Sequence, residues 1–219
     1  MAKKNATRSS IQKGYQDYIL DHGRVPETVR IFTKSLGIDD EAFYKHYGSL
    51  HNIEKSIWED YYSRTLDIIH KDPDFQEMNG REKHLSFLYT MLELVKPDRS
   101  YILYKLENKK PHELPSELRE AQKVILQSED INWAKNFEFL PDRVKETTQS
   151  AYKKVLSSHT VALLLFWVKD ESGESKDTDV FIEKSTRTAF DIGELPAVDS
   201  FFDLSKFFIQ KMGFSKVTL

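Results

Sequence analysis

Few side chains in this 219-residue chain have a type and spacing that could support catalysis. The sequence has no cysteine, which excludes disulfides, thiol catalysis and cysteine-based zinc sites. Its eight glycines are scattered and form neither a Walker loop nor a dinucleotide-binding fingerprint. His46, His51 and Glu54 lie close in sequence, but their spacing matches no standard metal site, and a solvated surface is the better interpretation. We therefore expect no enzyme activity, no metal and no cofactor.

Other side chains are of the kind that lines a binding cavity, since ligand sites are mainly apolar with few polar groups. Aromatic residues make up 12% of the chain, which favours a bulky apolar ligand. Plain core packing is an equally good interpretation for any single aromatic residue, and His159 on an apolar helix stripe is more often a hydrogen-bonded core histidine than a ligand contact. The candidates for a ligand pocket are Leu88, Tyr101, Tyr104, Trp133, Phe137, His159 and Phe166.

Two short helices joined by a tight turn are predicted between Thr28 and Asn52. Thr28 can cap the first helix, because its hydroxyl can accept a hydrogen bond from a free backbone N–H. Gly37 suits the left-handed residue that ends this helix, and Asp39 can cap the next one. Two helices around a glycine-containing turn are the helix-turn-helix pattern of DNA-binding proteins.

This stretch resembles the N-terminal module of the TetR family of one-component transcriptional regulators. The residues that carry the resemblance are Gly23, Thr28, Val29, Ile31, Gly37, Ile38 and the run Phe43-Tyr44-Lys45-His46-Tyr47. The resemblance is specific over about the first fifty or sixty residues and concerns only the architecture after that. It implies that DNA would be contacted by residues around the second helix, for which the candidates are Thr28, Asp39, Asp40, Glu41, Tyr44, Lys45 and His46.

The sequence departs from the family where DNA would be touched. The recognition helix of the family usually opens with Ser, a basic or polar residue, Gly and Thr, whereas this one opens with Asp39-Asp40-Glu41-Ala42. The basic residue usual just before the next helix is Leu50 here. DNA affinity comes largely from Lys and Arg that neutralise phosphates, so three carboxylates at this position would weaken it. The carboxylates also suit a helix N-terminus, which explains the helix but does not restore DNA affinity.

The remaining apolar spacing predicts an all-α chain. A first helix is expected over residues 8–22, and long helices over 50–71, 80–95 and 142–169. Pro97 should separate the helix over 80–95 from a helix that ends near Asn108, and Ser116 should cap a further helix. Further helices are expected over 179–192 and 197–212. We expect two domains, a helix-turn-helix module over residues 1–50 and a helical ligand-binding and dimerisation domain over residues 51–219.

The last expected helix is apolar on too many sides to cover only its own core. We expect it to pair with a second copy beside the helix that carries residues 152–167, giving a four-helix interface in a homodimer. The candidate interface residues are Phe201, Leu204, Phe208 and Met212. The longest apolar run, residues 161–168, is far shorter than the about 20 residues that a membrane span needs, and the N-terminus lacks a secretory signal. We expect a cytoplasmic protein.

Two functions remain open. The first is a TetR-like regulator, a dimer whose DNA binding is modulated by a small apolar ligand. The second is a protein with the same fold that has lost DNA binding and binds a lipid or other apolar ligand, a protein partner, or both. The family resemblance favours the first function, and the acidic residues at positions 39–41 favour the second.

Overall fold

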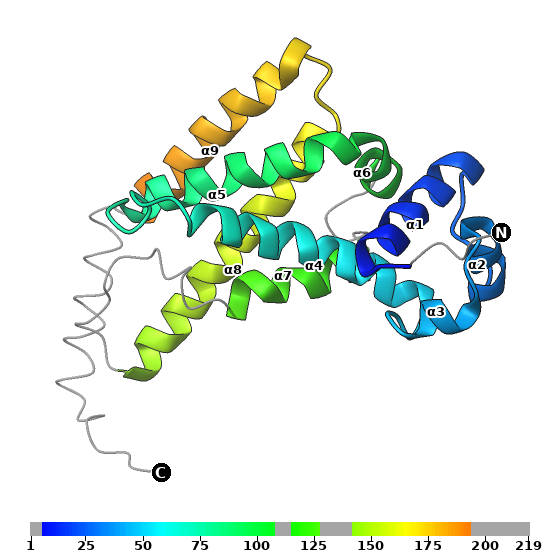
Figure 1. Cartoon of the computed structure of the whole chain (residues 1–219). Coiled ribbons are helices and arrows are strands. Elements are labelled where there is room, and N and C mark those ends of the chain that lie inside the picture. The colour runs from blue at the N-terminus through cyan, green and yellow to red at the C-terminus, as the bar shows by residue number, and fades with distance from the viewer. Residues whose placement is uncertain (1–5, 108–114, 128–141, 194–219) are drawn as a thin grey trace.

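The protein is described by a computed structural model over residues 6–107, 115–127 and 142–193. Every regular element in these ranges is helical, which confirms the all-α prediction. Helices α1–α3 lie together at one end, and α4 runs from them into a larger layer formed with α5 and α7–α9 (Figure 1). The candidates that fall outside the described residues are Trp133, Phe137, Phe201, Leu204, Phe208 and Met212.

Side-chain caps start the helices of the N-terminal module, and Thr28 and Asp39 are the caps expected from the sequence. Thr7 caps α1 (Arg8–His22) and Thr28 caps α2 (Val29–Leu36), while α3 spans Asp40–Tyr44. The helices α1 and α2 end at Gly23 and Gly37, whose φ angles of 64° and 70° lie in the left-handed region where glycine is favoured. The bounds of α1 and the turn at Gly37 agree with the sequence prediction.

The core of this module is centred on the fully buried Phe32. Its ring lies edge-on to Tyr15 and Tyr18 of α1 and to Phe43 of α3, with centroids 5.7, 6.2 and 6.2 Å away. Ile31, the apolar residue just before Phe32, is 42% exposed. Consecutive residues on a helix point about 100° apart, so Phe32 inside leaves Ile31 outside.

The larger part begins with α4 (Leu50–Ile69), which Ser49 caps, and continues with α5 (Gly80–Val95), which Asn79 caps. A 3-10 turn, Lys96–Asp98, carries Pro97 and leads into α6 (Arg99–Leu106). This order matches the expected break at Pro97. Helix α6 packs against α1, so the chain returns to the N-terminal module after forming α5.

Three more helices complete the described fold. They are α7 (Ser116–Gln127), α8 (Asp142–Trp167) and α9 (Lys176–Gly193), with a 3-10 turn at Gly173–Ser175 before α9. Helix α7 packs along α4, and α9 packs on both α5 and α8. None of the described helices is long and apolar enough to cross a membrane.

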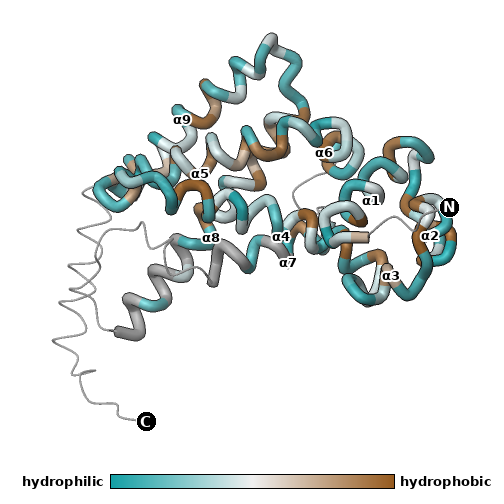
Figure 2. The backbone as a smooth tube through the Cα atoms, in the orientation of Figure 1, coloured by the Kyte–Doolittle hydropathy of each residue, from teal (hydrophilic) through white to brown (hydrophobic). Residues whose placement is uncertain are grey.

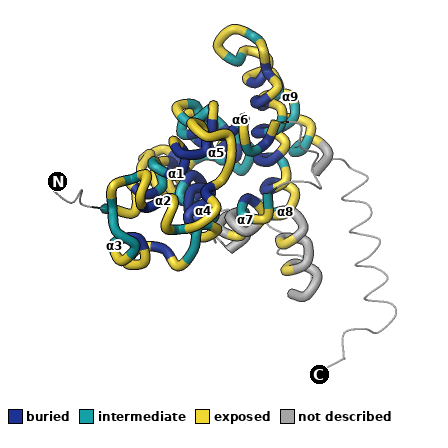
Figure 3. The backbone as a smooth tube through the Cα atoms, turned by 90° about the vertical axis from the view of Figure 1, so that its right-hand side faces the viewer, coloured by how far each residue is buried: buried dark blue, intermediate teal, exposed yellow. Residues whose placement is uncertain are grey.

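Buried side chains run continuously from the N-terminal module into the larger layer. Figure 3 shows the buried segments gathered on the inner sides of the helices, while hydrophilic and hydrophobic stretches alternate along them in Figure 2. The largest side chains of the inner layer include Trp58, Tyr62, Phe87 and Trp167, each at most 1% exposed. One hydrophobic core therefore links the module to the rest of the chain.

The apolar stripe that the sequence predicts for α8 is only partly confirmed; it consists of Tyr152, Val155, His159, Ala162, Phe166 and Trp167. Val155 and Phe166 are 54% and 37% exposed, whereas Leu163, Leu164 and Trp167 are fully buried. A helix as apolar as residues 161–168 fits two registers, and the sequence alone does not choose between them. Of the predicted stripe, Trp167 is buried as expected, whereas Val155, Ala162 and Phe166 lie on the outer face.

Candidate functional site

The three carboxylates at the start of α3 do not share one environment. The Asp39 carboxylate accepts a hydrogen bond from the backbone N–H of Ala42 at 2.8 Å, so it acts as the N-cap. Asp40 points back toward α2, where its Oδ1 accepts from the Thr33 hydroxyl at 2.5 Å and its Oδ2 lies 3.3 Å from the Arg30 guanidinium. Glu41 is exposed and pairs with Lys45 one turn later, at 3.0 Å. Each carboxylate therefore has a partner within the module.

These pairs also occupy cations that could otherwise meet phosphate. Arg30 and Lys45 are both exposed, and each is held by a carboxylate of its own module. Surface pairs of this kind are weak, on the order of 1 kcal/mol or less, so they can be exchanged for a stronger anion. Lys34 is also exposed and takes part in none of the ion pairs found in the described residues.

The other DNA-contact candidates, Thr28, Tyr44 and His46, are all exposed. Tyr44 is 57% exposed, and its ring rests edge-on against Phe43. The ring nitrogen Nε2 of His46 lies 2.9 Å from the Ala6 carbonyl, and because a carbonyl only accepts, the histidine donates. The Thr28 hydroxyl accepts from the Ile31 N–H at 3.2 Å. Thr28 and His46 therefore shape the backbone, and Tyr44 has the freest side chain of the set.

A buried polar network joins the module to the larger part. Glu54 of α4 forms an ion pair with Lys105 of α6, with side chains only 5% and 14% exposed. The other carboxylate oxygen of Glu54 accepts from the Tyr15 hydroxyl of α1 at 3.4 Å. Burial, with the nearby charge of Glu54, raises the pKa of Tyr15, so this phenol keeps its proton.

Further contacts of α6 and the preceding turn reach α1. The Tyr104 hydroxyl donates to the carbonyl of Gly23 at 3.1 Å. Asp98 accepts from the Tyr61 hydroxyl at 2.7 Å and lies 3.6 Å from Lys13. Movement of α6 and the preceding turn would therefore act on the C-terminal end of α1 and on Lys13 within it.

The described ligand-pocket candidates lie in different surroundings. Leu88 and Tyr101 are fully buried in the core. Tyr104 is 40% exposed and faces the N-terminal module. His159 is bonded to His84, and Phe166 stacks on Phe181 at the surface between α8 and α9. Leu88 and Tyr101 therefore lie in the core, whereas Tyr104 and Phe166 lie at two different surfaces.

Four buried polar groups of Trp and Tyr side chains also lie in the core, and of their residues the sequence had suggested only Tyr101 as a site residue. The indole N–H of Trp58 and of Trp167 and the hydroxyls of Tyr62 and Tyr101 have no hydrogen-bond partner among the described residues. An unsatisfied buried donor costs about 1–3 kcal/mol, so each would gain from an acceptor on a bound molecule or water. Trp58 and Tyr62 are four residues apart on α4, a spacing that gives no sign of such a role in the sequence.

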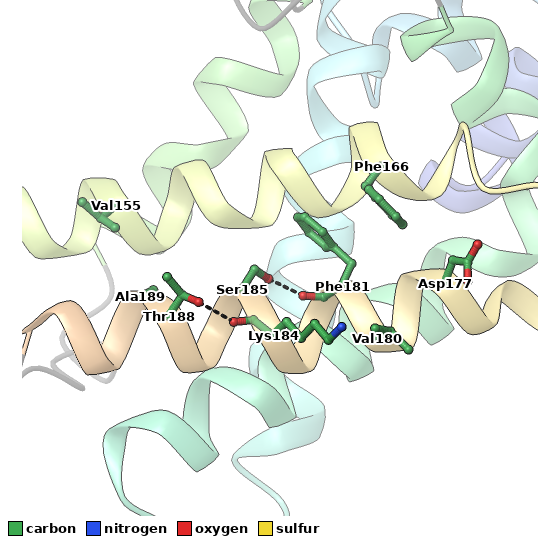
Figure 4. A pocket seen from close by; sticks show the side chains of 9 residues that line it. All are labelled: Val155, Phe166, Asp177, Val180, Phe181, Lys184, Ser185, Thr188 and Ala189. Atoms are coloured by element: carbon green, nitrogen blue, oxygen red, sulfur yellow. Dashed lines mark hydrogen bonds between the residues drawn. The ribbon is translucent and has the colours of Figure 1, made fainter.

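An apolar groove runs between α8 and α9 (Figure 4). Phe166 and Phe181 stack face to face across it, with ring centroids 4.5 Å apart. The groove has a volume of ≈ 750 Å³ and is open to solvent along its length. Its lining is Val155, Phe166, Asp177, Val180, Phe181, Lys184, Ser185, Thr188 and Ala189. Of these, only Phe166 was predicted as a site residue.

Comparisons with known proteins agree with the architecture. The family model described as "Tetracyclin repressor-like, C-terminal domain" matches residues 83–208. Among solved structures, the chain is similar to the fatty acid degradation regulator FadR from Bacillus halodurans. The TM-score is 0.52 at 14% identity, over 85% of this chain and 96% of that one, a likeness that concerns the fold alone. No curated protein matches the sequence.

Proposed function

This chain belongs to the tetracycline repressor-like (TetR) family, and from that premise we propose that it is a one-component transcriptional regulator. In this proposal it is a cytoplasmic homodimer whose binding to DNA is modulated by a small apolar ligand. The observation that carries the proposal is the N-terminal module, in which α2, the turn at Gly37 and α3 form a helix-turn-helix. Four of its exposed side chains could meet DNA, namely Arg30, Lys34, Tyr44 and Lys45.

The ligand part of the proposal is supported by the unsatisfied donors of the inner layer. Two indole N–H groups and two phenol hydroxyls among bulky apolar side chains suit an apolar molecule that carries hydrogen-bond acceptors. Because Lys105 of α6 is bonded to Glu54, and Tyr104 to Gly23, a ligand that displaces α6 would also displace α1. Such a ligand would change the distance between the two recognition helices of a dimer.

The dimer part of the proposal is supported by the groove between α8 and α9. Val155, Phe166 and Val180 are large apolar side chains that are 37–54% exposed on one face. Exposed apolar patches of this kind mark association sites in soluble proteins. A second copy related by two-fold symmetry would cover each groove with the other.

A second candidate function is favoured by the ion pairs of α3. In a protein with this fold that does not bind DNA, the Arg30–Asp40 and Lys45–Glu41 pairs would simply be surface pairs. Such a protein would bind an apolar ligand or a protein partner only. The two functions differ in whether DNA phosphates replace Asp40 and Glu41 as the partners of Arg30 and Lys45.

The deciding experiment measures DNA binding as a function of salt. The wild-type protein is titrated onto a duplex from its own upstream region and onto a scrambled duplex, from low to physiological salt. The double variant Asp40→Asn/Glu41→Gln is compared with it. The amide oxygen that this variant carries at position 40 can still accept from Thr33, while Arg30 and Lys45 are released from their carboxylates.

For a regulator we expect sequence-specific binding by the wild type, and tighter binding by the variant with a steeper salt dependence. Two released cations make the slope of log K against log salt steeper by up to about 2, since each neutralised phosphate contributes about 0.9. The matched control Asp67→Asn/Glu171→Gln changes the same charges at exposed positions outside the module and should leave the slope unchanged. Equal, negligible binding by all three proteins would favour the second function.

A further inference from the structure

Two histidines from different helices are hydrogen-bonded beneath the α8–α9 groove. His84 of α5 is 1% exposed, and its Nε2 lies 2.9 Å from Nδ1 of His159 on α8. The other ring nitrogen of His159 lies 2.7 Å from the hydroxyl of Ser185 on α9. These contacts join three helices, and Ser185 is itself part of the groove lining (Figure 4).

The partners fix the direction of each bond in this relay. The Ser185 hydroxyl donates to the carbonyl of Phe181 at 2.5 Å, so its oxygen accepts from Nε2–H of His159. Nδ1 of a neutral His159 then carries the lone pair and accepts from Nε2–H of His84. A proton added at Nδ1 of His159 would put hydrogens on both facing nitrogens and break the bond between the rings.

The surroundings of the relay disfavour a positive charge. The rings of Phe190 and Phe181 from α9 lie 6.1 Å from His84 and His159, respectively. Burial, with the charge of His159, lowers the pKa of His84 to about 3, and burial also lowers the pKa of His159.

The charged side chains next to the relay on α5 and α9 are directed elsewhere. Lys83 lies over the Phe75 ring, Glu183 accepts from the Tyr89 hydroxyl, and Lys184 faces the groove. The pKa of both rings is set by burial first, and the neighbouring histidine lowers that of His84 further. A proton placed on the relay is therefore disfavoured by the loss of solvent and by the second ring.

We propose that the relay His84–His159–Ser185 is a proton-sensitive latch that holds α9 against α5 and α8. With both rings neutral, the three helices are tied together and Ser185 is fixed in the groove. Protonation breaks the contact between the rings or leaves a buried charge, and α9 loosens. Because the loosened form takes up protons more readily than the latched form, acidification raises the population in which α9 and the groove are loosened. This inference stands whether or not the protein binds DNA.

The direction of the pH effect follows from proton binding. Both histidines have a lower pKa in the folded state than the ordinary 6.5, so below pH 6.5 the unfolded chain binds more protons. The contribution of the relay to stability is complete above pH 6.5 and is lost as the pH falls from there toward 3. Between pH 7.5 and 5.5, His84 should lower the folding equilibrium constant by about tenfold, and His159 should lower it further in the same direction.

The test compares urea unfolding at pH 7.5 and 5.5, at one protein concentration, for the wild type and His159→Gln. The side-chain amide of glutamine can donate and accept hydrogen bonds in the relay, but it does not titrate. We expect the folding equilibrium constant of the variant to fall less than that of the wild type over this interval, because one of the two histidines whose pKa is lowered has been removed. The matched control is His70→Gln at an exposed position after α4, which should behave as the wild type. Identical pH dependence of wild type and His159→Gln would overturn the latch.

Two measurements on the wild type do not depend on a variant folding. Ring NMR signals should show His84 still neutral at pH 5.5 and His159 titrating below pH 6.5, and titration of both near 6.5 would contradict the proposal. Hydrogen exchange, corrected for the intrinsic effect of pH, should rise more in α9 than in α1 between pH 7.5 and 5.5. Equal changes in the two helices would show that α9 is not held by the relay.

Discussion

The side chain of Asp170 closes the turn between α8 and α9. Its Oδ1 accepts from the backbone N–H of Ser172 at 2.8 Å, and its Oδ2 accepts from the backbone N–H and the hydroxyl of Thr178 at 2.9 and 2.5 Å. Burial alone would raise the pKa of Asp170, but the hydrogen bonds from Ser172 and Thr178 outweigh it and lower the pKa to about 2. The ionised carboxylate therefore organises the start of α9.

We expect Asp170→Ala to lower the free energy of unfolding by about 1–3 kcal/mol, because the fully buried Thr178 loses its acceptor. Urea unfolding at pH 7 measures the effect, and Glu171→Ala at the exposed neighbouring position serves as the control. The folded-state pKa lies below the ordinary 3.8, so this contribution is present above pH 3.8 and is lost as the pH falls toward 2. A pH-independent difference between wild type and variant would contradict this account.

The capping residues Thr28 and Asp39 and the terminating glycine Gly37 could be predicted from sequence, because each acts on backbone within three residues of itself. The partners of Asp40 could not. Its carboxylate meets Arg30 across the turn of the helix-turn-helix, and that contact depends on the angle between α2 and α3. The acidic charge counted in the sequence is therefore neutralised in a way that composition does not reveal.

Helices α8 and α9 expose an apolar face that their own core does not use. Val180 is 48% exposed, and Phe166 and Phe181 stack across the groove rather than inside the layer. For long apolar helices of this kind, sequence periodicity predicts that a helix forms but not which face is inner. The pairing of α9 with both α5 and α8 decides it, since it buries Ile182 and Thr186 and leaves Val180 outside.

If the groove is the dimer contact, Phe166→Glu should weaken self-association by about tenfold or more, because a carboxylate would be buried without a partner. Sedimentation across micromolar concentrations measures the dissociation constant. The control Ile68→Glu places the same charge at a 45% exposed apolar position of α4, away from the groove. An unchanged dimer in Phe166→Glu, or an equal loss in both variants, would place the contact elsewhere.

The N-terminal module and the larger helical layer share one core and one buried ion pair. Glu54 and Lys105 are far apart in sequence, and no local pattern pairs them. The sequence therefore predicted the helices on both sides of this junction but not the junction itself. The division at residue 50 falls at the start of α4, the helix that contributes to both sides.

Breaking this pair should destabilise the whole protein. Lys105→Met leaves the Glu54 carboxylate buried without its cation, and we expect a loss of about 3–5 kcal/mol in the free energy of unfolding. The double variant Glu54→Gln/Lys105→Met should recover much of that loss, since the amide that replaces the carboxylate can still accept from Tyr15. Urea unfolding of both variants measures the coupling. Equal destabilisation of the two would mean that Glu54 is not stabilised by Lys105.

The helix caps of the N-terminal module have a consequence for the order of folding. Thr7, Thr28, Asp39 and Ser49 each bond a backbone N–H only three residues ahead, so these helix starts need no distant part of the chain. The contacts that hold α1 in place, from Gln12 to Ser56 and from Tyr104 to Gly23, span 44 and 81 residues. Local contacts form faster than distant ones. During synthesis the module would therefore acquire its helices early but reach its final orientation only after α6 has left the ribosome.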